Sequence, residues 1–154
     1  MSQSDLLILI AKYLEQKEAE LLEILVNLFQ MPLREDITSA DTVIFMDEDC
    51  ESIASVWIYY DGKNKKIDKN DKSLFPGRSL EIINLSNPQN DLILRQISDI
   101  SESEEKFEYL DALANLVKNW FADVWKKADG ENYPLPVALA VHDDFGDGKV
   151  VKLS

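Results

Sequence analysis

The first thirty residues carry apolar side chains at helical spacing. Intervals of three, four or seven residues separate Leu6, Ile10, Leu14, Leu21, Leu25 and Leu28. This spacing places the side chains along one face of an α-helix. We therefore predict a helix from Ser4 to Gln30, with Ser2 and Asp5 as a capping pair at its start and Pro32 just beyond its end. Two shorter helices with a break at residues 15–20 are the alternative.

A second helical repeat lies in the later part of the chain. It carries a wide apolar stripe, with glutamates in its first turn and lysines in its last, as the helix dipole favours. We predict a helix over residues 101–128, with a capping box of Ser101 and Glu104. A shorter helix is predicted over residues 88–97, because Asn87 and the proline after it resemble an N-cap and a first helical position. A strand at Leu92–Leu94 is the alternative there.

Five segments have the composition of β-strands. β-Branched and aromatic residues are concentrated in Thr42–Asp47, Ser52–Tyr60, Leu80–Leu85, Val137–His142 and Lys149–Leu153. An acidic turn, residues 47–51, connects the first two, and Asp147–Gly148 is a hairpin signal between the last two. The polar and basic stretch at residues 63–72 is predicted to be a loop, with the start of an irregular edge strand as the alternative.

The order of these elements favours an α+β fold. The strands come as a block between long helices and then as a closing hairpin, and they do not alternate singly with helices. We predict an antiparallel sheet of about five strands, with two long helices packed on one face. No linker or internal repeat divides the chain, so residues 1–154 are interpreted as a single domain.

Strand periodicity indicates a second surface of the sheet. Along the strand of residues 52–60, Val56 and Ile58 point to one face, while Trp57 and Tyr59 point to the other. If the helices cover only the aliphatic face, these two aromatic side chains lie on an open face. Aromatic residues are enriched at binding hot spots, so Trp57 and Tyr59 are candidate contacts for a protein partner. A covering loop of the same chain is the alternative.

Composition excludes several kinds of site. The chain has one cysteine, Cys50, and one histidine, His142, so it has no intramolecular disulfide and no zinc site of several Cys or His ligands. The net charge of -13 opposes binding to nucleic acid, which requires clustered Lys and Arg. No segment has the length of a membrane span, and the start lacks the basic region of a signal peptide. We expect a cytoplasmic protein without metal or cofactor.

The sequence does not indicate an enzyme. His142 and Asp143 are the most suggestive pair, because a carboxylate can orient a histidine that acts as a general base. Neighbours on a strand point to opposite faces, however, and we expect these two not to pair. Cys50 lies among acidic residues, which raise the pKa of a thiol and weaken it as a nucleophile. No nucleotide-binding or hydrolase motif is present.

Charge is unevenly distributed along the chain. Residues 35–51 contain seven acidic residues and no basic one, whereas residues 62–78 contain six basic and two acidic residues. A negative surface attracts basic partners and raises their association rates. We therefore expect a small acidic protein-binding module, such as an inhibitor or immunity-type protein, that docks a basic partner. The expected contacts are Asp47, Glu48, Asp49 and Glu51, with Trp57 and Tyr59 as apolar anchors. A solvated surface without a partner is the alternative.

A different interpretation is a structural domain that associates with itself. The stretch Leu6–Ile10 contains only apolar residues, so a helix there is apolar on all sides. Such a region is buried on several sides, either within the chain or against a second copy of it. A homodimer formed through the first helix is the second functional hypothesis, and a weak cation or small-ligand site on the open face is a third.

Overall fold

Helix α1 (Gln3–Gln30) forms as its apolar repeat predicts. The computed structural model describes residues 2–66, 68–85 and 91–154. The Ser2 hydroxyl accepts a hydrogen bond from the Asp5 main-chain N–H at 3.2 Å, and the Asp5 carboxylate accepts one from the Ser2 N–H at 3.1 Å. This is the predicted capping box. The helix continues without a break to Gln30 and ends two residues before Pro32.

The sheet has five strands in the order β3-β2-β1-β4-β5. Their bounds are β1 (Ile37–Met46), β2 (Ala54–Gly62), β3 (Ser79–Asn84), β4 (Val137–Val141) and β5 (Val151–Lys152). The prediction of a purely antiparallel sheet was wrong, because β4 runs parallel to β1 while the other neighbours are antiparallel. After β3 the chain passes through the helical layer and re-enters the sheet beside β1 in the same direction, as a parallel pair requires.

The second long helix begins at Lys106 and not at Ser101 as predicted, and the shorter helix before it extends to Ser101 instead of ending at residue 97. Helix α2 (Asp91–Ser101) and helix α3 (Lys106–Lys127) are separated by a turn at residues 102–105. The Ser101 hydroxyl donates to the Ser98 carbonyl at 2.6 Å and so belongs to the end of α2, not to a cap of α3. The predicted cap at Asn87 lies outside the described residues. Two short 3₁₀ turns, η1 (Gly130–Asn132) and η2 (His142–Asp144), flank β4.

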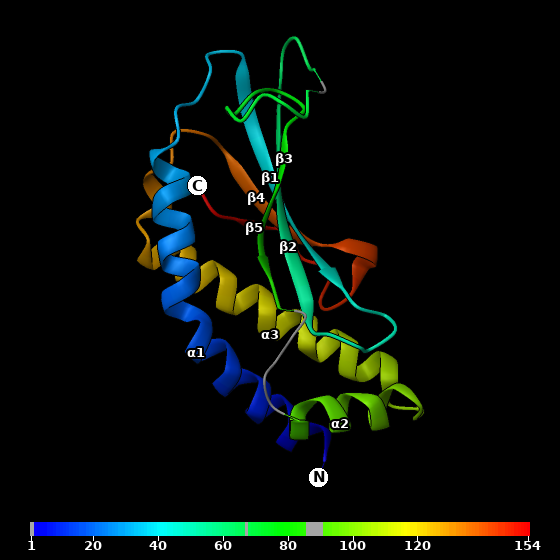
Figure 1. Ribbon diagram of the computed structural model, residues 1–154. Coiled ribbons are helices and arrows are strands. Elements are labelled where there is room, and N and C mark those ends of the chain that lie inside the picture. The colour runs from blue at the N-terminus through cyan, green and yellow to red at the C-terminus, as the bar shows by residue number, and fades with distance from the viewer. Residues whose placement is uncertain (1, 67, 86–90) are drawn as a thin grey trace.

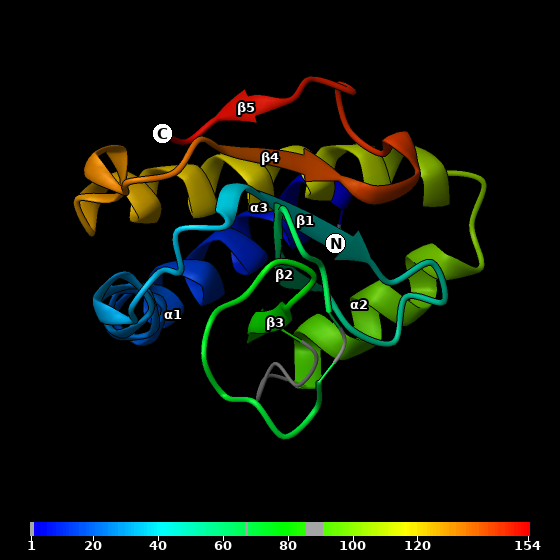
Figure 2. The ribbon, with the colours of Figure 1, turned by 90° about the horizontal axis from the view of Figure 1, so that it is seen from above.

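The long helices α1 and α3 pack on one face of the sheet, with α2 beside them (Figures 1 and 2). Every second side chain of a strand faces this helical layer. Val56 and Ile58 of β2 are fully buried there. The apolar start of α1 is also buried against the other helices. Leu6 and Ile10 are inaccessible, and Ile8 is 55% exposed. Packing within the chain therefore accounts for most of the stretch that is apolar on all sides.

The closing hairpin is attached to α3 by polar contacts. The ammonium group of Lys118, a buried side chain, donates to the Asp147 carboxylate and, at 3.1 Å, to the Lys149 carbonyl. One turn along the same helix, the Asn115 side chain accepts from the Asp147 N–H at 2.9 Å, and Asp111 accepts from the Gly146 N–H at 2.9 Å. These contacts fix the segment that follows β4 and with it the position of η2.

Candidate functional site

The turn between β1 and β2 is ordered by one carboxylate. Asp47 accepts hydrogen bonds from the main-chain N–H groups of Asp49 (2.9 Å) and Glu51 (3.1 Å). It also accepts one from the Ser52 hydroxyl at 2.7 Å. Cys50 takes a left-handed backbone conformation with a φ of 58°, and its side chain is buried. Asp47 is thus part of the framework of the turn, while Glu48, Asp49 and Glu51 remain available at its surface.

A second acidic turn lies at the same end of the sheet. Because β1 and β4 are parallel and Ile44 pairs with Val141, both strands end together, and the turns that follow them are neighbours in both ribbon views (Figures 1 and 2). Asp143 and Asp144 are exposed on the turn after β4. The His142 ring lies 4.9 Å from the Phe45 ring, centroid to centroid, which joins the two turns.

The expectation that His142 and Asp143 do not pair was wrong. The Nδ1 atom of His142 lies 3.0 Å from the Asp143 carboxylate. The strand ends at Val141, and Asp143 has a φ of 59°, so the alternation of side chains no longer applies at this pair. Both side chains are more than half exposed, so water competes with this contact.

The turn between α2 and α3 brings further carboxylates to this end of the molecule (Figures 1 and 2). Glu102, Glu104 and Glu105 are exposed on it. Helix α3 begins directly after this turn, at Lys106, whose positive charge lowers the pKa of the buried Cys50 thiol. We call the exposed carboxylates of the three turns the acidic end; they are Glu48, Asp49, Glu51, Glu102, Glu104, Glu105, Asp143 and Asp144. The contribution of residues 102–105 was missed, since the sequence placed them inside a helix.

The carboxylates of the acidic end are largely free of basic partners. Among the ion pairs of the described residues, only the pair of His142 and Asp143 involves one of them. Not all of the acidic stretch at residues 35–51 gathers here. Glu35 and Asp36 precede β1 and lie at its other end, where Asp36 pairs with Arg34 at 2.7 Å.

The basic segment of residues 63–78 lies away from the acidic end. It connects β2 to β3 at the end of the sheet where β1 begins, and the Lys63 N–H donates to the Asp36 carbonyl at 2.9 Å. The segment folds on itself: Lys66 pairs with Asp71, and its ammonium group lies 4.5 Å from the centroid of the Phe75 ring. The segment keeps an excess of positive charge, but its place at the opposite end of the sheet leaves the acidic end uncovered.

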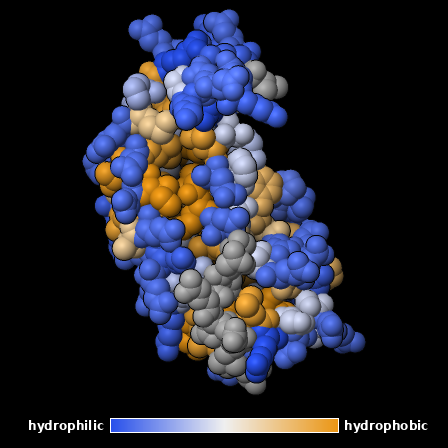
Figure 3. Space-filling model, viewed as in Figure 1, coloured by the Kyte–Doolittle hydropathy of each residue, from blue (hydrophilic) through white to orange (hydrophobic). Residues whose placement is uncertain are grey.

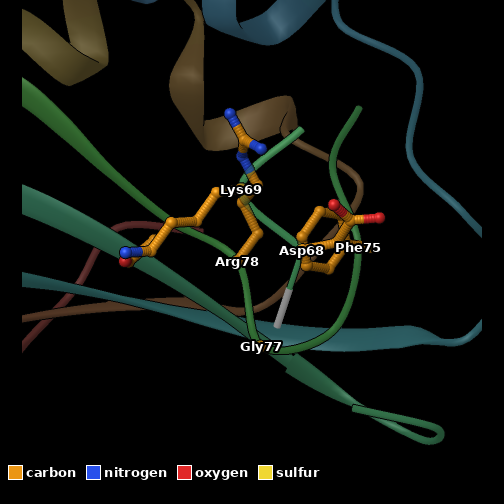
Figure 4. A pocket seen from close by; sticks show the side chains of 6 residues that line it. Asp68, Lys69, Phe75, Gly77 and Arg78 are labelled. Atoms are coloured by element: carbon orange, nitrogen blue, oxygen red, sulfur yellow. The ribbon is translucent and has the colours of Figure 1, made fainter. Parts of the chain in front are cut away.

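A hollow of about 320 Å³ opens within the basic segment. It is lined by Asp68, Lys69, Phe75, Gly77, Arg78 and Ser79. Figure 4 shows the side chains of Lys69 and Arg78 pointing in different directions around it. The Arg78 guanidinium donates to the Asp71 carbonyl, so part of its hydrogen-bonding capacity is used inside the segment. The two positive groups do not converge on one point.

The open face of the sheet is defined by the side chains that point away from the helices. Trp57 lies between Val43 of β1 and Glu81 of β3, and Tyr59 lies between Asp41 and Ser79. The Trp57 side chain is half-buried and Tyr59 is 38% exposed. Small side chains, Ala138 and Ala140 of β4, continue this face toward β5. The predicted orientation of the two aromatic residues therefore agrees with the strand register.

Titratable groups buried behind the acidic turn are held in their neutral forms. Burial is the main cause that raises the pKa of the Cys50 thiol; the charge of Lys106 lowers it, and the charges of Asp47 and Asp49 raise it again. Burial also raises the pKa of the Tyr109 hydroxyl. A protonated, enclosed thiol is a poor nucleophile. The chemistry that this region offers is electrostatic attraction and apolar contact.

The described part of the chain contains no cluster of three or more His, Cys, Asp or Glu side chains placed to hold a metal ion. Asp47, Asp49 and Glu51, which alternate in the sequence, lie in a turn, where Asp47 is occupied by main-chain donors. None of the described helices is long and apolar enough to cross a membrane. No protein-family model, no curated protein and no solved structure matches this chain.

Proposed function

We propose that this protein is an acidic binding module that docks a basic protein on the open face of its sheet. The observation that carries the proposal is the meeting of three acidic turns at one end of the molecule, next to a sheet whose open face presents Trp57 and Tyr59. Unpaired carboxylates attract a basic surface, and aromatic side chains retain it. An inhibitor or immunity-type role is one form that this docking takes.

The two parts of the surface have different tasks. The acidic end guides the partner during approach, so its contribution weakens as salt is added. The open face provides apolar area that is desolvated on contact, and this mainly slows dissociation. Asp47 contributes through the turn that it orders, because its oxygens accept three hydrogen bonds within the chain.

Site-specific photo-crosslinking in the cells from which the chain comes tests this proposal. A benzophenone side chain replaces Trp57 in one variant and Asn119, on the solvent side of α3, in the other. We expect a basic protein to be crosslinked from position 57 and not from position 119. Mass spectrometry of the crosslinked product gives the identity and charge of the partner.

Charge variants provide the matched control for the crosslinking experiment. Glu48→Gln, Asp49→Asn and Glu51→Gln together remove three charges from the acidic end. Glu15→Gln, Glu23→Gln and Asp123→Asn remove three exposed charges from the helices. The first set should reduce the crosslinked product and the second should not. An acidic product, equal capture from both positions, or no product at position 57 contradicts the proposal.

A further inference from the structure

A second surface lies on the other side of β3, between this strand and α1. The groove there has a volume of about 350 Å³ and is lined by Ile24, Asn27, Leu28, Met31, Leu80, Glu81 and Ile82. Figure 3 shows it as an apolar area bordered by polar side chains on the same side of the molecule as α1 and β3. We call it the α1–β3 groove. It is separate from the open face, because Leu80 pairs with Ile58 and so points to the helical side.

The strand that borders this groove is the edge of the sheet. The Arg78 carbonyl accepts from the Tyr60 N–H at 2.9 Å, so the main chain of Arg78 faces β2. Main-chain direction alternates along a strand, and Leu80 therefore also faces β2, while Ser79 and Glu81 point their N–H and C=O groups outward. The Glu81 side chain belongs to the open face, since it pairs with Trp57. The part of Glu81 nearest the groove is thus its main chain.

The chemistry of the groove restricts what fits it. Its apolar lining suits side chains that alternate with polar ones, as in an extended peptide, while the outward main-chain groups of β3 supply hydrogen bonds to that peptide. The charged residue of the lining is Glu81, and the exposed Glu23 adjoins Ile24 on α1. Basic side chains on the peptide are favoured beside these two carboxylates.

We propose that the α1–β3 groove binds an extended basic segment of a partner protein as an added strand beside β3. Alternate apolar side chains of the segment lie on Ile24, Leu28 and Leu80, and the Lys or Arg side chains between them face Glu81 and solvent. Main-chain hydrogen bonds to Ser79 and Glu81 fix the register. This inference does not rest on the proposed docking at the acidic end, which uses the opposite face of the sheet.

The probe is a capped octapeptide of alternating valine and lysine, added to the full-length protein labelled with ¹⁵N. We expect the amide signals of Ser79 and Glu81 to shift together with those of the groove residues. A peptide of alternating valine and glutamate should bind more weakly. Shifts centred on Trp57 and Tyr59 would instead place the peptide on the open face and contradict the groove assignment.

Main-chain pairing is tested by methylating the peptide nitrogens. One version carries methyl groups on its lysine nitrogens and the other on its valine nitrogens. In an added strand only alternate N–H groups face β3: those of the lysines in an antiparallel strand and those of the valines in a parallel one. We expect one version to lose binding and the other to retain it. Equal effects of the two contradict strand addition, whichever direction the strand takes.

A protein variant tests the same contact from the other side. Glu81→Pro removes the outward N–H of an edge strand, a position at which proline is tolerated. This variant should bind the valine–lysine peptide about fivefold to tenfold more weakly, as the loss of one hydrogen bond predicts. Glu81→Gln removes the charge and keeps the N–H, and is the matched control for this main-chain effect.

The alternative to a partner peptide at the edge of β3 is a second copy of the chain. Light scattering on the free protein detects it, and a dimer that Glu81→Pro converts to a monomer would contradict the peptide assignment. Unchanged peptide binding by Glu81→Pro contradicts it as well. If Glu81→Pro fails to fold, the two methylated peptides decide the question with the unaltered protein.

Discussion

At the scale of single residues, the contact of Lys118 with Asp147 joins a buried ammonium group to the closing hairpin. The ammonium group is buried on α3 and balanced by the carboxylate and by the Lys149 carbonyl. A buried positive charge without its partner is strongly destabilising, whereas a buried pair replaced by apolar groups often is not. The pair therefore fixes the closing hairpin more by specifying its position than by adding stability.

Asp147→Asn is expected to destabilise the protein more than Lys118→Met, because only the former leaves the buried ammonium group unbalanced. The hydrogen bond from Lys118 lowers the pKa of the Asp147 carboxyl. Its contribution to the free energy of unfolding is therefore present above the ordinary aspartate range and is lost as the pH falls through the lowered pKa. Thermal unfolding of the wild type and both variants from pH 7 to pH 2.5 measures this pH-dependent contribution.

The control for this prediction is the difference in Tm between the wild type and Asp147→Asn. That difference should shrink as the pH falls, since the protonated carboxyl no longer pairs with Lys118. A constant difference over this pH range would show that the charge of Asp147 has no part in holding the hairpin.

The buried hydroxyl pair of Tyr60 and Tyr133 gives a second prediction at this scale. The two oxygens lie 2.9 Å apart, and both side chains are buried. Tyr60→Phe leaves the Tyr133 hydroxyl without this partner and should cost about 1–2 kcal/mol of unfolding free energy. Tyr60→Phe with Tyr133→Phe should cost less than the sum of the single changes. Urea unfolding of the four proteins measures the coupling, and strict additivity would contradict it.

The same pair affects stability in alkali. Burial, followed by the hydrogen bond to Tyr133, raises the pKa of the Tyr60 hydroxyl. The folded state therefore retains this proton above the pH at which an unfolded tyrosine loses it. Stability is lost as the pH rises beyond the ordinary tyrosine range. Absorbance of tyrosinate during alkaline unfolding should appear together with the loss of structure and not before it.

At the scale of elements, the sequence predicts helices and strands well where periodicity is strong. The capping box of Ser2 and Asp5, the continuous apolar stripe of α1 and the opposite faces of Val56 and Trp57 all follow from local spacing. The direction of β4 does not, because a strand has the same pattern whichever way it runs. The turn at residues 102–105 was missed since glutamate and serine are compatible with a helix start as well as with a turn.

The β1–β2 turn provides a prediction at this scale. Asp47→Ala removes three hydrogen-bond acceptor contacts within the turn and should cost about 1–2 kcal/mol of unfolding free energy. Glu48→Ala, which removes an exposed side chain beside it, should leave stability nearly unchanged. Chemical denaturation of both variants checks this. Equal stabilities would show that Asp47 is an ordinary surface residue.

The hairpin of β1 and β2 also depends on the absence of a side chain at Gly62. A Cβ atom there would lie 1.9 Å from the Asp36 carbonyl oxygen, which is part of the main chain and has little freedom to move. Gly62→Ala should therefore markedly lower the Tm. Gly148→Ala is the control: it meets no atom within 4 Å, and its φ of 68° costs about 1 kcal/mol. A milder effect at Gly62 than at Gly148 would contradict this account of the register.

At the scale of the whole molecule, function depends on which segments the fold brings together. Residues 47–51 and 143–144 are far apart in the sequence and become neighbours through the parallel pairing of Ile44 with Val141. A sequence reveals that each segment is acidic but not that both lie at one end. The sequence also overestimates how many carboxylates of residues 35–51 lie together, because Glu35 and Asp36 lie at the other end of β1.

The arrangement polarises the molecule along its sheet. The acidic end lies where β1 ends, and the basic segment of residues 63–78 lies where β1 begins. A partner with a basic surface therefore meets a directional field, and local carboxylates should affect its association rate more than the net charge does. The α1–β3 groove is independent of this effect, because main-chain hydrogen bonds and apolar contact dominate there.

The most direct test is the association rate constant with the partner crosslinked at position 57, measured at low and high salt. Removing three charges at the acidic end (Glu48→Gln, Asp49→Asn, Glu51→Gln) should lower the rate constant about tenfold at low salt and much less at high salt. Removing three charges from the helices (Glu15→Gln, Glu23→Gln, Asp123→Asn) should leave it within about twofold. Equal reductions by both sets would show that net charge alone acts, and would contradict docking at the acidic end.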